Sequence, residues 1–221
     1  MRRLMVGVIA ALSVWFSPGV IATAAESPPQ QGTVTRTVDG GTFNCADVRA
    51  QTRKLLAAHP ELRTRDPNFT AWAESTQPEM DTCRSKITIT QKIVGRQSAS
   101  FPGTTTALAW DGQQSLHVWQ DIYSGVWPNP WLATGHVAGN VWYAAGCCTQ
   151  AVDNPSCWTD TQVGYIGGVD SCFWEWPNAG TCCTGADNNF WFAPFDAPFI
   201  HFNHWVKAWV DSWGNVSAQG G

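Results

Sequence analysis

The cysteine pattern constrains this chain more than any other feature of its sequence. Six of the eight cysteines lie between Trp142 and Phe192, and four of those six form two adjacent pairs. Residues 146–154 (GCCTQAVDN) are echoed by residues 180–188 (GTCCTGADN). An aromatic, strand-like run precedes each copy, and each copy ends in an Asp-Asn pair, which is typical of a turn. The repeat therefore predicts two similar β-loops that are joined by cross-links.

The cysteines are expected to form disulfides rather than to bind zinc. Structural zinc sites favour cysteine pairs with a short spacer, and no Cys-x-x-Cys occurs in the chain. Adjacent cysteines are expected to bond to other partners, because the short Cα spacing across one peptide strains the ring they would close. Six cysteines allow 15 connectivities, among which the sequence does not choose, and the set we favour is Cys148–Cys157, Cys172–Cys182 and Cys147–Cys183.

The two remaining cysteines are predicted to bond to each other. Cys45 stands at the start of a helical pattern, and Cys83 just precedes a strand-like run. A bridge between them would attach a helix to a sheet. The alternative is that each of them pairs with a cysteine of the downstream cluster. In both cases the sequence predicts four disulfides and no free thiol.

The N-terminus predicts export from the cell. Residues 1–25 combine a short basic start, an apolar core and a small-x-small cleavage site, which together indicate a secretory signal peptide. The alternative, a membrane anchor, is disfavoured because the apolar run is short and ends in a processing signal. Residues 26–32 are rich in Pro and Gln and are predicted to form a disordered leader. We therefore expect a secreted, extracellular protein with no membrane span after cleavage.

Charge and aromatic residues divide the mature chain at about residue 96. Residues 33–96 are mixed in charge, whereas residues 97–221 carry nine acidic residues against a single basic one, Lys207. The second part also holds twelve of the fourteen tryptophans. A surface of this kind repels phosphates, so nucleic acid is excluded as a partner. The two parts are expected to form one compact domain.

The first part is predicted to contain a strand, a helix and a second strand. Residues 33–38 alternate and are followed by an Asp-Gly-Gly turn. A helix is predicted from Asn44, as its N-cap, to the residue before Pro60. The polar stretch 62–77 is predicted to be irregular, and residues 86–94 alternate as a strand.

The second part is predicted to be built of β-strands. A hairpin is expected from 104–110 and 114–123, about an Asp-Gly turn. Residues 205–213 fit both a helix face and a strand, and their Trp and Val content favours a strand. Further strands are predicted at residues 136–144, 162–169, 172–176, 190–192 and 199–202. The fold class is thus mainly β: an antiparallel, sandwich-like domain with one N-terminal α-helix, stabilised by disulfides.

A tryptophan-rich surface is the candidate for function. Trp127 and Trp131 stand in a loop stiffened by two prolines, and Trp174 and Trp176 flank Glu175 beside the cysteine cluster. Exposed indoles among polar groups suit sugar rings, because the apolar C–H faces of a sugar stack on the indole while its hydroxyls form hydrogen bonds. We expect these five residues to form one site for a glycan or a cell-surface polysaccharide. The general alternative for any single tryptophan is burial in the core.

Two other function classes compete with glycan binding. A secreted glycosidase would need two facing carboxylates, and Glu175 with Asp170 or Asp196 are the candidates. A toxin-like or inhibitor-like protein would use the same aromatic surface against another protein. Known motifs for serine nucleophiles, zinc proteases and phosphate binding are absent from the sequence. The sequence therefore favours a non-catalytic protein.

No cofactor or metal is predicted. His201 and His204 are three residues apart near Asp196, but on a strand their side chains would point to opposite faces. His117 and Asp121 share one strand face without a third ligand. These histidines are expected to be hydrogen-bonded locally.

Overall fold

A computed structural model describes residues 32–94, 111–126, 128–178 and 182–221. The elements of the first part are β1 (Gly32–Asn44), α1 (Ala46–Ala58), the 3-10 helix η1 (Pro60–Thr64), α2 (Pro67–Glu74), the 3-10 helix η2 (Pro78–Asp81) and β2 (Thr82–Val94). The elements of the second part are β3 (Gly112–Ser124), β4 (Trp131–Ala144), β5 (Cys148–Ala151), β6 (Ser156–Thr161), β7 (Tyr165–Glu175), β8 (Cys183–Pro194), β9 (Phe202–Asp211) and β10 (Val216–Gly220).

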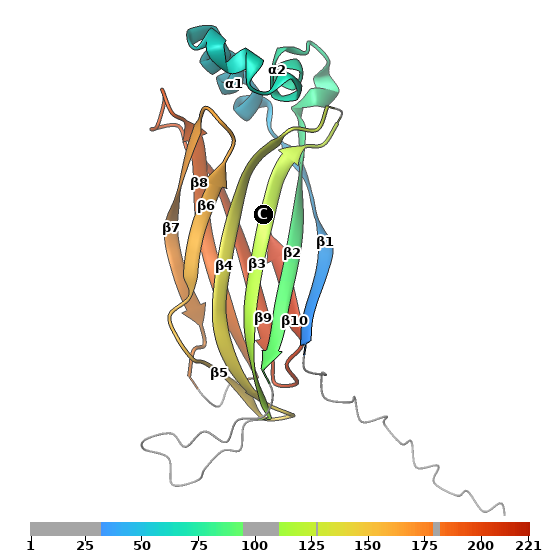
Figure 1. Cartoon of the computed structure of the whole chain (residues 1–221), viewed down its shortest axis with the longest axis vertical. Helices are drawn as coiled ribbons and strands as arrows, with labels where there is room; N and C mark the ends of the chain where they lie inside the picture. The colour runs from blue at the N-terminus through green and yellow to red at the C-terminus, as the bar shows by residue number, and fades with distance from the viewer. Residues whose placement is uncertain (1–31, 95–110, 127, 179–181) are drawn as a thin grey trace, which may run out of the picture.

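The strands form two antiparallel sheets that pack face to face (Figure 1). The larger one, sheet A, has the order β1-β2-β3-β4-β5, with β6 also paired to β4. The smaller one, sheet B, has the order β10-β9-β8-β7. Both helices lie at one end of the sandwich and β5 lies at the other. The predicted fold class, a mainly β antiparallel sandwich, is confirmed.

Alternating side chains fill the space between the sheets. In β3 every second residue is buried, including Leu116, Val118 and Ile122. In β9 the buried residues are Val206 and Val210, with the alanine between them. The intervening tryptophans of β9 point to the outer face, as expected for period two. The prediction of a strand is therefore confirmed for residues 205–211, whereas residues 212 and 213 lie in the turn that follows.

The described residues form two α-helices where one was predicted. α1 begins at Ala46 with Cys45 as its N-cap, so the predicted N-cap is wrong by one residue, although the Asn44 side chain accepts a hydrogen bond from the Ala46 N–H at 2.8 Å. α2 lies inside the stretch predicted to be irregular. Asp66 caps it by accepting from the Phe69 N–H at 2.9 Å. A helix of eight residues has too little apolar periodicity to be seen in the sequence, and it is stabilised by the fully buried Trp72.

β3 does not form the predicted hairpin with the residues just before it. Its one edge pairs with β2 and its other edge with β4, along nearly its whole length. Residues 104–110, the expected first arm, lie outside the described residues. Because β2 and β3 pair, the parts on either side of residue 96 contribute to one sheet. Gly32, assigned to the leader, is already part of β1 opposite Ile93.

Disulfides join the N-terminal helix to sheet A and sheet A to sheet B. The predicted Cys45–Cys83 bridge is confirmed, with a Cα–Cα distance of 5.6 Å. The three predicted pairings of the downstream cluster are wrong. Cys157 on β6 bonds to Cys172 on β7, with a Cα–Cα distance of 5.8 Å, and this bridge crosses from one sheet to the other.

The two Cys-Cys repeats are neighbours, but threonines join them rather than cysteines. The Thr149 and Thr184 hydroxyl oxygens lie 2.8 Å apart and are fully buried. Cys147 bonds to Cys148, which was judged unfavourable from the sequence. The sulfur atoms of Cys182 and the next residue lie 2.7 Å apart, which is longer than a disulfide bond, so the described residues have three disulfides and the prediction of four is wrong. Successive residues of a strand point to opposite faces of the sheet. Because Thr149 and Thr184 point toward each other between the sheets, the cysteine before each of them points to the outer face of its own sheet, and the two cysteines do not meet.

No helix within the described residues is long and apolar enough to cross a membrane. The segment predicted to be a signal peptide, residues 1–25, lies outside the described residues.

Candidate functional site

The structure separates the residues that were expected to form one ligand site. Trp131 begins β4 at the helical end of the sandwich, opposite Tyr123. The Cys-Cys loop pairs with the far end of the same 14-residue strand, through Ala144 and Cys148. At the usual rise per residue the two lie roughly 40 Å apart. Trp127 lies outside the described residues. The proline loop and the Cys-Cys loops therefore belong to different ends of the molecule.

The three residues at the end of β7 point in different directions. Trp174 faces the core, where its indole packs over Gly139 and its Nε1 donates to the Asp153 carbonyl at 2.5 Å. Trp176 follows the strand and is 57% exposed. Glu175 lies on the outer face of sheet B, where it forms an ion pair with Lys207. Of these three residues, only Glu175 lies on the outer face of a sheet.

The carboxylates considered for hydrolysis do not face one another. Glu175 ends β7, whereas Asp196 follows β8 at the opposite end of sheet B, 3.8 Å from His59. Asp170 is exposed in the middle of β7, five residues before Glu175, which is roughly 16 Å along a strand. Glycosidases hold their two carboxyl groups within about 10 Å of each other. The described positions of these acids therefore do not supply a glycosidase pair.

The outer face of sheet B carries a regular arrangement that sequence reasoning missed. We call it the indole face and define it by Trp191, Trp205 and Trp209. Each of these tryptophans has a glycine directly opposite it on the neighbouring strand or chain end. The three pairs are Trp191 with Gly168, Trp205 with Gly221, and Trp209 with Gly185.

Each indole lies across its partner glycine. A Cβ atom on Gly185 would stand 2.8 Å from Cδ1 of Trp209. A Cβ atom on Gly168 would stand 2.7 Å from Cζ2 of Trp191. Such distances would be severe clashes, so the rings occupy the space that other residues would fill. The glycines let the indoles lie down on the sheet instead of standing away from it.

The three tryptophans are distributed along the sheet and are all partly exposed. Trp205 and Trp209 stand four residues apart on β9, which places them roughly 13 Å apart on the same face. Trp191 lies on β8 near the helical end, stacked on His201 with ring centres 4.0 Å apart. The indole face is therefore an elongated strip that runs parallel to β9 and ends at the Trp191–His201 stack.

Charged groups in the middle of the strip are paired. Lys207 forms ion pairs with Glu175 and with Asp187, the latter at 3.1 Å, and its Nζ lies 5.5 Å from the centre of the Trp209 ring. Burial lowers the pKa of Lys207, but its hydrogen bonds to the two carboxylates outweigh burial and raise the pKa above its usual value. The lysine therefore stays charged at neutral pH. With two acids and one base, the centre of the face is net negative.

Polar side chains between the indoles are hydrogen-bonded or buried within the sheet. Asn189 lies in the same strand row as Trp205 and donates to the Ser171 hydroxyl at 2.7 Å. Asp187 is almost fully buried, and among the described residues its Oδ1 has no hydrogen-bond partner. Aromatic faces with oriented amide and carboxylate groups between them are typical of carbohydrate sites, where stacking and hydrogen bonding act together.

The histidines near this face do not share a metal site. His201 stacks on Trp191 at the surface, whereas Nδ1 of His204 lies 3.1 Å from the Gly221 carbonyl oxygen. Burial lowers the pKa of His204 to about 4, despite that hydrogen bond. Neither imidazole faces Asp196, which lies beside His59.

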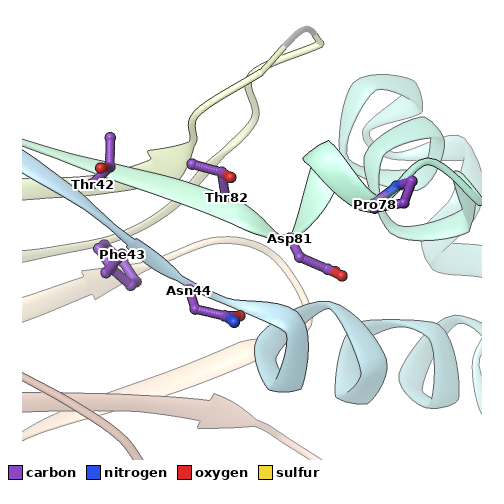
Figure 2. Close-up of a pocket in the computed structure, with 6 residues that line it drawn as sticks. All are labelled: Thr42, Phe43, Asn44, Pro78, Asp81 and Thr82. Atoms are coloured by element: carbon purple, nitrogen blue, oxygen red, sulfur yellow. The ribbon is translucent and has the colours of Figure 1, made fainter.

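A hollow lined by the ends of β1, η2 and β2 is a weaker candidate (Figure 2). It measures about 520 Å³ and is lined by Thr42, Phe43, Asn44, Pro78, Asp81 and Thr82. Its carboxylate, Asp81, already accepts a hydrogen bond from Arg49 Nε at 2.7 Å. The polar groups of this hollow therefore serve the helix–sheet junction.

Comparison with known proteins does not assign the chain to a family. No family model matches the sequence, and no curated protein or solved structure is significantly similar to it.

Proposed function

We propose that this protein is a secreted, non-catalytic binding protein whose indole face holds a neutral polysaccharide. The observation that carries the proposal is the pairing of each outer tryptophan of sheet B with a glycine. Trp174 packs over Gly139 on the inner face in a similar way, so what sets these three indoles apart is that they share one outer, partly exposed face. Three rings that lie down along one strip suit an extended ligand with repeating flat, apolar faces.

The order of the indoles favours a chain-like ligand. Rings held against a sheet lose little conformational entropy on binding, because they are already fixed in place. Polar groups lie between the rings of the strip, namely the amide of Asn189 and the ion pairs of Lys207. A polysaccharide presents C–H faces and hydroxyls in the same alternation, whereas a small ligand would contact only one ring.

Charge favours a neutral ligand over an anionic one. Sheet B contains a single basic residue, Lys207, and its charge is already paired with Asp187 and Glu175. An anionic polysaccharide would meet this net negative centre without an available cation. A neutral polysaccharide meets no such penalty.

The proposed location outside the cell agrees with the signal-peptide pattern of residues 1–25. It also agrees with the disulfides, which persist in oxidising compartments and are rare in the cytosol.

Affinity electrophoresis of the mature protein tests the proposal. The probes are gels containing mixed-linkage β-glucan, xyloglucan or galactomannan, together with insoluble cellulose and chitin, and polygalacturonate as an anionic contrast. At least one neutral probe should retard the protein or bind it, and polygalacturonate should not. Trp205→Ala and Trp209→Ala should each weaken retention by about 1–3 kcal/mol, the range for aromatic hot spots.

Trp213→Ala is the matched control. Trp213 is 50% exposed in the turn between β9 and β10, where its ring lies beside Gly146 and not over a strand of sheet B, so its loss should leave retention unchanged. Retention by no neutral probe would refute the proposal. Release of reducing sugar from a bound probe, abolished by Glu175→Gln, would instead show a hydrolase.

A further inference from the structure

The outer face of sheet A carries a second group of indoles. Trp119, Trp131 and Trp158 come from three different strands, and their side chains share that face by register. Trp119 and Trp158 lie on either side of His136 in one row, roughly 10 Å apart at the usual strand spacing. Trp131 lies near the helical end of β4, roughly 15 Å from that row.

Trp158 is held flat by a histidine beneath it. Its ring is nearly parallel to His136, with an angle of 6° and 4.5 Å between ring centres, and it is 38% exposed. His136 is fixed in turn, because Nε2 lies 3.0 Å from an Asp160 oxygen and Nδ1 lies 3.1 Å from Nε2 of His117. Hydrogen bonds on both nitrogens set the plane of the imidazole. One indole face is therefore covered and the other is turned to solvent.

Trp131 is also held in place by hydrogen bonds. Its Nε1 donates to the Thr134 hydroxyl at 2.7 Å, and that hydroxyl donates to Asp121 at 2.7 Å. The indole is 36% exposed and borders a hollow of about 470 Å³, which Tyr123 and Lys86 also line. An aromatic pair, a carboxylate and an ammonium thus converge on one depression.

We infer that the outer face of sheet A is a second polysaccharide-binding face, and that the protein cross-links two chains. This inference rests on the proposed function of the indole face. Both faces show the same construction: indoles held by a specific neighbour on one outer sheet face, with hydrogen-bonded polar groups between them. The residues that carry the second face are Trp131 and Trp158.

The geometry of a sandwich makes two such faces bivalent. The two sheets are separated by a packed core of about 10 Å, and their outer faces point in opposite directions. A single stiff chain cannot lie along both faces. Two occupied faces therefore connect two chains, and the effective concentration of the second site strengthens binding to a dense matrix.

The test separates binding from cross-linking. Three variants are compared with the wild-type mature protein: Trp131→Ala/Trp158→Ala, Trp205→Ala/Trp209→Ala, and the quadruple combination. One readout is retention in gels of mixed-linkage β-glucan, xyloglucan or galactomannan, and the other is aggregation of beads coated with the same polysaccharides. Trp213→Ala is the control, and circular dichroism with sedimentation confirms that every variant is folded and has the wild-type oligomeric state.

The inference predicts a specific pattern. Each double variant should still be retained, at least about tenfold more weakly, and should no longer aggregate beads, whereas the quadruple variant should lose both properties. If Trp131→Ala/Trp158→Ala behaves as wild type in both readouts, the second face is refuted and the indole face stands. If the wild-type protein is retained by no neutral probe, the proposed function and the inference fail together.

Discussion

Trp209 on β9 lies directly opposite Gly185 on β8, and its indole crosses the position that a Cβ atom on that glycine would occupy. This relationship connects the fold with the proposed function. A larger residue at the glycine would turn the ring away from the sheet, although the strand itself would tolerate one.

The first prediction follows from that pair. In Gly185→Ala the new methyl group would stand 2.8 Å from Cδ1 of Trp209, so the ring must rotate off the sheet. We expect polysaccharide retention to weaken by about 1–2 kcal/mol, close to the effect of Trp209→Ala. Thermal unfolding should change little, because alanine suits a strand at least as well as glycine.

The control for this prediction is Gly32→Ala. No atom lies within 4 Å of the position its Cβ would take, and it stands at the start of β1 in the other sheet. Its retention should equal that of the wild type. Unchanged retention in Gly185→Ala would show that the flat orientation of Trp209 is not needed for binding.

The second prediction compares two disulfides by the loops they close. Cys157–Cys172 encloses 15 residues of chain and joins the two sheets, whereas Cys147–Cys148 joins adjacent residues. Replacing both cysteines by serine in the first pair should lower the free energy of unfolding by about 3 kcal/mol. The same change in the second pair should cost well under 1 kcal/mol through chain entropy. Denaturant unfolding measures both, and equal losses would contradict the loop argument.

The third prediction concerns the ion pairs of Lys207. Lys207→Met leaves Asp187 and Glu175 as facing, partly buried carboxylates with no cation between them. We expect the variant to lose about 2 kcal/mol of unfolding free energy, because removing one partner of a buried pair exposes the desolvation cost of the other. Lys92→Met, at an exposed position on β2, should change stability by less than about 0.5 kcal/mol. If the two variants are equally stable, the ion pairs of Lys207 contribute nothing measurable.

The fourth prediction is acid destabilisation through His204. This imidazole packs among Phe43, Phe190 and Phe192, and burial lowers its pKa to about 4 from an ordinary value near 6.5. Between these values the unfolded chain binds more protons, so stability falls as the pH drops from about 6.5 to about 4. The loss attributable to His204 is at most about 3 kcal/mol.

Denaturant unfolding at several pH values between about 4 and about 7 checks this prediction, because that range spans the pKa of His204 in the folded and in the unfolded chain. His204→Gln removes the titrating group, so its stability should depend less steeply on pH than that of the wild type. Burial also lowers the pKa of His117 and of His136, so part of the slope should remain in the variant. Parallel pH curves for wild type and variant would contradict the role of His204.

The sequence by itself determined the fold class and many of the strands. Alternation is a local property, so the buried isoleucines of β2 and valines of β9 could be predicted from spacing alone. The Cys45–Cys83 bridge was also predictable. Cys45 stands at the start of a predicted helix and Cys83 just before a predicted strand, and a bridge between them attaches the helix to the sheet. α2 was missed because eight residues are too few for a clear period, although Asp66 and Pro67 carried its start signal.

The tertiary structure alone decided which residues meet. Register between strands placed Trp131 and the Cys-Cys loops at opposite ends of β4, so the site expected from their shared composition does not form. The same register placed Trp209 opposite Gly185, although the two are 24 residues apart in the chain. Glycine and tryptophan carry no sequence signal for each other, because their pairing depends on how strands align and not on local propensity. For that reason the pairing of the cysteines between 147 and 183 and the indole face emerged only from the assembled sheets.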